Sequence, residues 1–184
     1  MIVIADTSPL NYLILIGRAD LLPTLFGRVL IPQVVFDELQ AAGASAQVRD
    51  WTRNIPEWIE VKQTGLSAND SLDLLDAGER AAILLAQELS ADLLLLDDKQ
   101  ARQAAVSVGI AITGTLGILD KAARENLIDL KTVVEELQKT SFRISDDLVR
   151  KLVEESDKRE SREKFLQALN KVPKAEPDEE DKFE

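Results

Sequence analysis

The sequence DLLLLDDKQAR at residues 92–102 decides the fold class of this 184-residue chain. Its four consecutive leucines, residues 93–96, form an apolar run that is too short for an ordinary helix and ends at two aspartates. A short apolar run between polar residues is typical of a strand that is buried on both faces, as in parallel sheets. The chain opens in the same way, because residues 2–5 lead directly into Asp6. Open α/β sheets bind ligands at the carboxyl ends of such strands, so both aspartate positions are candidates for a functional site.

Short apolar runs alternate with helical patterns along most of the chain. The expected strands are residues 2–5, 29–31, 59–62, 93–96 and 110–113. The expected helices are residues 10–16, 21–26, 32–43, 44–58, 77–89, 99–108, 116–123 and 132–137, with Ser8 as the N-cap of the first. This alternation, with almost no hairpin signals, predicts a three-layer α/β/α sandwich around a parallel sheet.

The C-terminal part of the chain is strongly charged. Residues 146–169 read as one long helix whose middle is almost free of apolar residues. We expect this helix to project from the main domain or to pack on a partner chain, and we expect residues 172–184 to be disordered. The predicted organisation is a main domain over residues 1–140, a charged helix over residues 145–171 and an acidic tail.

The composition excludes several classes of function. The chain has no cysteine and no histidine, which rules out disulfides, thiolate or imidazole metal ligands, and Ser-His-Asp or Cys-His catalysis. Any metal site must use oxygen ligands, which favours Mg²⁺ or Mn²⁺. The formal net charge of −11 is unlike that of proteins that bind nucleic acid through bulk electrostatics. No apolar run suits a membrane span and the N-terminus lacks a basic flank, so a cytoplasmic location is expected.

Four acidic residues lie just after a predicted strand or in the first turns of the following helix. They are Asp6, Glu38, Glu79 and Asp98. In a parallel sheet these positions share one edge, so the four side chains should converge. Ionised carboxylates that are buried together repel each other, and burial raises their pKa, unless cations neutralise them. One or two divalent ions would do so, and such ions can activate water and stabilise charge on a phosphodiester.

Each acid also has a purely structural interpretation. Asp6 alone fits a helix cap, and Glu38 alone fits a solvated helix residue. Glu79 fits a capping box with Asp76, in which each side chain bonds the backbone of the other residue. The pair Asp97 and Asp98 is harder to explain in this way, because one helix cap does not need two aspartates.

The chain resembles a PIN domain over residues 1–140. The resemblance is carried by IVIADTSPL (2–10), IPQVVFDEL (31–39), AGERAAILLA (77–86) and LLLLDDKQARQAA (93–105) followed by Gly109. The patterns GExxAI (residues 78–83) and LLxDD (residues 94–98), together with TGTLGIL at residues 113–119, resemble a toxin-associated, VapC-like branch. PIN domains are metal-dependent ribonucleases, and the resemblance implies a parallel sheet of order 3-2-1-4-5.

The resemblance also implies a site. Its catalytic and metal-binding residues would be Asp6, Glu38, Glu79 and Asp98, with Asp97 as a nearby alternative to the last. Thr7 or Ser8 would supply the hydroxyl that often supports the first acid. Glutamate at position 79 departs from the pattern, because many members carry aspartate there.

Three basic residues follow these acids in the sequence. Arg80 follows Glu79, and Lys99 and Arg102 follow Asp98. They are candidates for contacts with RNA phosphates. Solvated bases on a helix surface explain them equally well, since basic residues normally lie on the surface.

The expected function is a Mg²⁺- or Mn²⁺-dependent endoribonuclease in which a metal-activated water cleaves RNA phosphodiester bonds. The resemblance further implies the toxin of a toxin–antitoxin pair, with an antitoxin protein as partner and a homodimer as the assembly. The alternative is a PIN-fold interaction module with little catalysis, acting through dimerisation or through its C-terminal helix. A receiver domain or a haloacid-dehalogenase-like phosphatase fits less well, because the phosphatase needs an aspartate where Ser8 stands.

Overall fold

The computed structural model describes residues 1–65, 72 and 74–170. The chain divides into two compact units, Met1–Ile144 and Ser145–Glu184. The first unit contains the sheet and the helices around it, and the second contains α9 (Asp146–Asn170). The predicted disordered tail at residues 172–184 lies outside the described residues.

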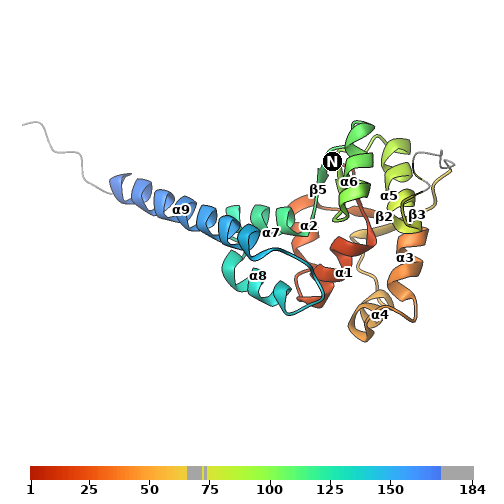
Figure 1. Ribbon diagram of the computed structural model, residues 1–184, viewed down its shortest axis with the longest axis horizontal. Coiled ribbons are helices and arrows are strands. Elements are labelled where there is room, and N and C mark those ends of the chain that lie inside the picture. Colours follow the sequence, from red (N-terminus) through yellow and green to blue (C-terminus); the bar gives the residue numbers. More distant parts are fainter. Residues whose placement is uncertain (66–71, 73, 171–184) are drawn as a thin grey trace, which may run out of the picture. The chain divides into compact units, whose positions relative to one another are not determined.

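A parallel sheet forms the centre of the first unit (Figure 1). Its strands are β1 (Val3–Ala5), β2 (Val29–Pro32), β3 (Ile59–Lys62), β4 (Leu93–Leu95) and β5 (Ile112–Thr113). Their order is β3-β2-β1-β4-β5, and all neighbours run parallel. With helices flanking this sheet, the predicted α/β/α fold and strand order are confirmed.

The leucine run of residues 93–96 is a buried strand, as the sequence predicts. Leu94, Leu95 and Leu96 have no exposed surface. Leu95 of β4 is in register with Ala5 of β1, so the two strands end side by side. The last predicted strand begins later than expected, because the Ile110 backbone N–H bonds the Ala105 carbonyl and closes the turn after α6 (Lys99–Ser107).

Helices connect each strand to the next. Along the chain they are α1 (Thr7–Leu15), α2 (Leu21–Phe26), α3 (Gln33–Gln40), α4 (Ala46–Thr52), α5 (Ala77–Glu88), α6, α7 (Thr115–Arg124) and α8 (Leu130–Gln138). Helix α5 packs on β1, β2 and β4. Its residues Ala82, Ile83 and Leu85 are almost fully buried in the core cluster that also includes Ile4 and Leu94. Strands β1, β2, β4 and β5 each lead within a few residues into a helix start at the carboxyl edge of the sheet.

Most helix boundaries differ from the prediction by a few residues, and two of the differences have a clear physical cause. Asp6, and not Ser8, is the N-cap of α1, because the Asp6 carboxylate accepts a hydrogen bond from the Ser8 backbone N–H. The helix expected over residues 44–58 ends at Thr52. Pro56 accounts for this end, since proline cannot continue a helix and favours an extended residue before it.

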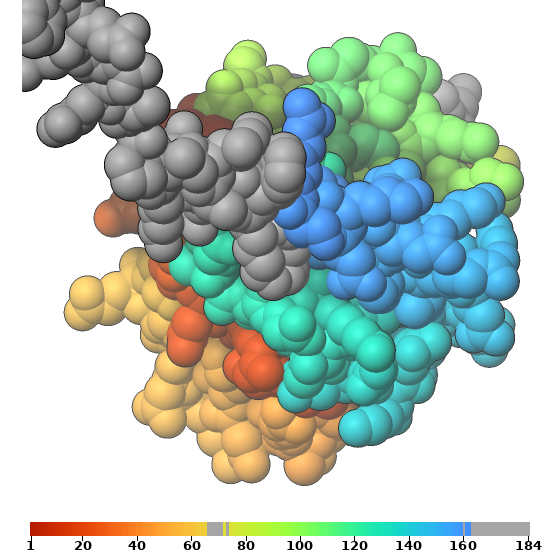
Figure 2. All heavy atoms as spheres, turned by 90° about the vertical axis from the view of Figure 1, so that its left-hand side faces the viewer, coloured from red at the N-terminus to blue at the C-terminus, as the bar shows by residue number. Residues whose placement is uncertain are grey.

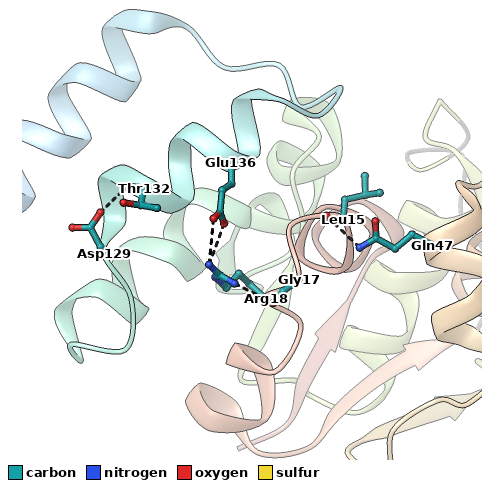
Figure 3. Close-up of polar contacts among 7 residues, drawn as sticks. All are labelled: Leu15, Gly17, Arg18, Gln47, Asp129, Thr132 and Glu136. Atoms are coloured by element: carbon teal, nitrogen blue, oxygen red, sulfur yellow. Dashed lines mark hydrogen bonds and ion pairs between the residues drawn. The ribbon is translucent and has the colours of Figure 1, made fainter.

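Polar contacts tie α8 to the N-terminal helices (Figure 3). The Arg18 guanidinium lies 3.1 Å from a carboxylate oxygen of Glu136 on α8. Asp129 caps α8 by accepting from the Thr132 backbone N–H at 2.8 Å. In Figure 2 the teal α8 lies beside the orange-red segment between α1 and α2. A pocket of about 460 Å³ lies there, lined by this segment and by residues 127–133.

The second unit begins with a capped helix. The Ser145 hydroxyl accepts from the Leu148 backbone N–H at 3.3 Å, and Asp147 pairs with Arg150 and Lys151 one turn later. The Ser145 contact satisfies one backbone N–H group in the first turn of α9, and the ion pairs between neighbouring turns stabilise the helix. No helix in the described part of the chain has both the length and the apolar character needed to cross a membrane.

Candidate active site

The carboxyl edge of the sheet carries a group of acidic side chains that we call the acidic cluster. Its members are Asp6 after β1, Glu38 on α3, Asp76 and Glu79 at the start of α5, and Asp98 at the start of α6. The charges of Asp76 and Glu79 raise the pKa of Asp6, and those of Asp76, Asp98 and Glu38 raise the pKa of Glu79. Asp6, Glu38 and Asp98 therefore each lie near enough to Glu79 for their charges to interact with it, whereas a shared role of the four acids in binding an ion stays a prediction.

Asp6 is the most buried member, with 3% of its surface exposed. Its backbone N–H donates to the Leu95 carbonyl at 3.0 Å, which fixes it beside the end of β4. Burial raises the pKa of Asp6 to about 7, hydrogen bonds from the Thr7 and Ser8 backbone oppose this, and two neighbouring carboxylates add to it. Asp6 is thus a buried acid whose negative charge is poorly compensated by the protein.

Glu38 is held by a contact that the sequence did not indicate. The Thr7 hydroxyl donates a short hydrogen bond to Oε2 of Glu38. We expected a hydroxyl of Thr7 or Ser8 to support Asp6. Instead Thr7 contacts the second acid, and Ser8 contacts Asp6 through its backbone N–H.

Glu79 has both of the roles considered for it. The capping box forms, because the Glu79 backbone N–H donates to Asp76 at 2.8 Å and the Asp76 backbone N–H donates to Glu79 Oε2 at 3.2 Å. Burial is the main cause that raises the pKa of Glu79 to about 7, followed by the charge of Asp76. Asp76 is the member of the cluster that the sequence analysis missed. Its place directly before a helix at the sheet edge is the signal that could have indicated it.

Asp98 is exposed and caps α6. One of its oxygens accepts from the backbone N–H groups of Gln100 and Ala101, at 2.7 and 3.0 Å. Asp6, Asp76 and Asp98 therefore each cap a helix. The N–H groups and dipole at a helix start stabilise a nearby carboxylate. Three helix starts at one edge explain how the fold tolerates so many acids there.

Asp97 has a different environment from Asp98. Its carboxylate accepts from the Thr115 backbone N–H at 2.8 Å and from the Thr115 hydroxyl at 2.6 Å. Burial raises the pKa of Asp97, and the Thr115 hydrogen bonds and the Arg102 charge partly offset this. A side chain on Gly114 would collide with Asp97, so glycine permits the contact. The two aspartates thus have separate tasks, since Asp98 caps α6 and Asp97 joins the end of β4 to α7.

We expect Thr115→Val to lower the free energy of unfolding by about 1.5–3 kcal/mol, the usual range for a hydrogen bond to a charged group. The substitution keeps the shape of a fully buried side chain and removes one donor to the half-buried Asp97 carboxylate. Urea denaturation measures the change. Thr24→Val is the matched control, because the Thr24 hydroxyl donates to a backbone carbonyl at an exposed site. Equal losses in the two variants would contradict the role given to Asp97.

Comparison with known proteins matches residues 2–158 of the chain to the family model DUF3368, a PIN domain. The chain belongs to the PIN-domain family. The match extends past residue 140, the predicted end of the domain, into the first part of α9. A solved PilT N-terminus domain protein from the hyperthermophilic archaeon Sulfolobus solfataricus P2 is also similar. It is 15% identical, with a TM-score of 0.46 over 79% of this chain and 100% of that one. No curated protein matches the chain.

PIN domains are generally nucleases, and three basic residues lie next to acids of the cluster in the sequence. Arg102 donates to the Leu96 carbonyl at 3.1 Å and lies beside Asp97, so it helps to hold the end of β4. Lys99 is exposed next to Asp98, and Arg80 is half-buried next to Glu79. Contacts of these three residues with RNA stay a prediction.

The donor chemistry of the PIN domain fits a hard divalent ion. All side chains of the cluster offer carboxylate oxygens, which Mg²⁺ and Mn²⁺ prefer. The pKa values of Asp6 and Glu79, both near 7, reflect a negative site that a cation would relieve. Within residues 1–65, 72 and 74–170, no three acids stand close enough together to hold an ion. Binding would therefore require the side chains to draw together around the ion.

Proposed function

We propose that this PIN domain is a Mg²⁺- or Mn²⁺-dependent endoribonuclease. The observation that carries the proposal is the position of five carboxylates at one sheet edge, among them Asp6 and Glu79, in which burial and the neighbouring charges raise the pKa to about 7. Like charges gathered in a partly buried place destabilise a fold unless a cation joins them. The carboxyl edge of a parallel sheet is also where α/β proteins bind ligands.

The proposed ligands are Asp6, Glu38, Glu79 and Asp98. When bound, the ion would supply a nucleophilic water and neutralise charge on the scissile phosphate. Contacts within the protein restrict three of these side chains: Thr7 bonds Glu38, the capping box holds Glu79, and the start of α6 holds Asp98. The carboxylates would still have to move closer together when the ion binds. Asp97 would act only through the position of its neighbour Asp98.

Protons compete with the ion for this site. Asp6 and Glu79 each have a pKa near 7, so near neutral pH they hold protons part of the time in the metal-free protein. A carboxylate must lose its proton to bind a metal, so binding releases protons. The affinity for the ion should therefore rise as the pH increases through 7.

Calorimetric titration of Mn²⁺ tests the proposal. We expect the unchanged chain to bind Mn²⁺ and Asp6→Asn to lose most of this affinity. Asp37→Asn is the matched control, because Asp37 lies next to Glu38 on α3 but is exposed and bonded to Gln33. Equal binding by Asp6→Asn and the unchanged chain would place the ion elsewhere and refute the proposed site.

The proposed substrate is RNA, and the proposed partners are an antitoxin protein and a second copy of the chain. The resemblance of the quoted segments to the toxin-associated branch supports these proposals. A fluorescent RNA of mixed sequence, incubated with the protein and Mn²⁺, gives the direct assay of cleavage.

An interaction module with little catalysis is the second candidate. It is favoured by the spacing of the acids in the described part of the chain, because no three of them lie close enough together to hold a metal ion. On this interpretation the unchanged chain neither binds Mn²⁺ nor cleaves RNA, at any pH between 6 and 9. The same titration and cleavage assay therefore distinguish the two candidates.

A further inference from the structure

Gly78 is a buried glycine in the first turn of α5, at a place where glycine is locally unfavourable. Glycine loses more conformational freedom in a helix than alanine, so a helix position normally favours alanine. Glycine is often used where the backbone needs a positive φ. Among the described glycines a positive φ occurs at Gly17, Gly27 and Gly109, and the backbone of Gly78 does not require it. Another reason must account for glycine at this position.

The space beside Gly78 is occupied by the Glu38 carboxylate. A Cβ atom added to Gly78 would lie 2.5 Å from Oε2, 2.9 Å from Cδ and 2.9 Å from Oε1 of Glu38. All three atoms of the carboxyl group therefore lie against the helix backbone at position 78. Distances below 3.0 Å are essentially never tolerated by a real Cβ atom, so alanine at this position would force the carboxylate to move.

The Glu38 carboxylate is held from a second side as well. Its Oε2 atom, the one nearest to Gly78, is also the acceptor of the Thr7 hydroxyl. The carboxylate thus lies between the start of α1 and the start of α5, where its charge acts on Glu79. Glu38 is the end of a flexible side chain, so a methyl group on residue 78 would displace the carboxylate without opening the core.

We propose that Gly78 is a positioning residue for Glu38. The missing side chain reserves the space in which the Glu38 carboxylate can bond Thr7 and face Glu79. The importance of this position for metal binding rests on the proposed function, whereas the steric relation between the two residues does not.

A thermal double-mutant cycle tests the steric relation without any need for activity. The variants are Gly78→Ala, Glu38→Ala and their combination. In the Glu38→Ala background we expect Gly78→Ala to raise Tm, because alanine is the better helix former and the space is empty. In the chain that keeps Glu38, the Tm change caused by Gly78→Ala should be at least about 3 °C lower than the Tm change in the Glu38→Ala background. The loss of one good contact produces a shift of this size in a domain of this length. Equal effects in both backgrounds would overturn the proposal.

Mn²⁺ affinity tests the positioning role. We expect Gly78→Ala to weaken binding about tenfold, the lower end of the range for residues that orient metal ligands. Glu38→Asp shortens the side chain by one methylene and makes room for the methyl group. In the Gly78→Ala background it should therefore recover part of the lost affinity, although in the unchanged background it weakens binding. A general loss of fold would not be rescued in this way.

Gly43→Ala is the matched control, because a Cβ at position 43 meets no atom within 4 Å. We expect the control to bind Mn²⁺ like the unchanged chain. Unaltered Mn²⁺ affinity in Gly78→Ala would overturn the positioning role. If the unchanged chain binds no Mn²⁺, the proposed function fails, and the thermal cycle alone decides whether Gly78 reserves the space for Glu38.

Discussion

Asp6→Asn is expected to reduce RNA cleavage about a thousandfold or more while the protein remains folded. The substitution keeps the size of the side chain, and asparagine caps a helix as well as aspartate does. It removes the negative charge of a proposed metal ligand that is almost fully buried. A metal ion contributes several kcal/mol of transition-state stabilisation, and about 4 kcal/mol corresponds to a thousandfold in rate. The measurement is kcat/KM on a labelled RNA at saturating Mn²⁺.

Asp37→Asn again provides the comparison for this experiment. Both variants lose one negative charge, but Asp37 is exposed on α3 and accepts a hydrogen bond from Gln33 within the same helix. We expect its cleavage rate to remain within about twofold of the unchanged chain, as surface substitutions usually have small effects. Cleavage that survives in Asp6→Asn at the full rate would remove the acidic cluster from the mechanism.

Asp6→Asn should also stabilise the metal-free protein above neutral pH. In the unfolded chain Asp6 loses its proton near its ordinary pKa of 3.8, whereas in the fold it holds the proton up to about pH 7. Between these values unfolding releases a proton, so the stability of the protein falls as the pH rises. At about 1.4 kcal/mol per pKa unit, the buried charge costs about 4 kcal/mol above pH 7, as an order of magnitude. Asparagine avoids this cost.

Urea denaturation in the presence of a chelator, at pH 4, 6 and 8, measures this effect. We expect Asp6→Asn and the unchanged chain to be similar at pH 4, and the variant to be the more stable of the two at pH 8. Asp129→Asn is a control of opposite sign, because hydrogen bonds from Thr132 lower the pKa of Asp129. A difference between Asp6→Asn and the unchanged chain that does not change with pH would show that the Asp6 charge is not its cause.

Together these two results would describe a trade of stability for function. Burial of the Asp6 charge lowers the free energy of unfolding, which a neutral side chain would avoid. In the proposed function, the buried carboxylate serves as a metal ligand. Addition of Mn²⁺ should then stabilise the unchanged chain at pH 8 and have little effect on Asp6→Asn, since a ligand stabilises only the state that binds it.

The sequence by itself determined the fold class, the strand positions and the edge of the sheet that carries the acids. This was possible because these properties depend on local patterns. An apolar run such as residues 93–96 is stable only when it is buried on both faces. A residue that comes shortly after a strand, such as Asp6 or Asp98, must lie near the carboxyl edge whatever the details of packing. The end of α4 at Thr52 could also have been predicted from the sequence, since Pro56 follows it closely.

Only the tertiary structure decided which partners these acids have. Thr7 bonds Glu38 across 31 residues of sequence, and Thr115 bonds Asp97 across 18. Gly78 leaves space for a carboxylate from another helix, and the charge of Asp76 reaches Asp6. Such contacts depend on how each helix is rotated and placed against its neighbours, and a change of rotation by one residue turns a side chain by about 100° around the helix. Periodicity fixes which face of a helix is buried, but the packing of whole helices decides which atoms meet there.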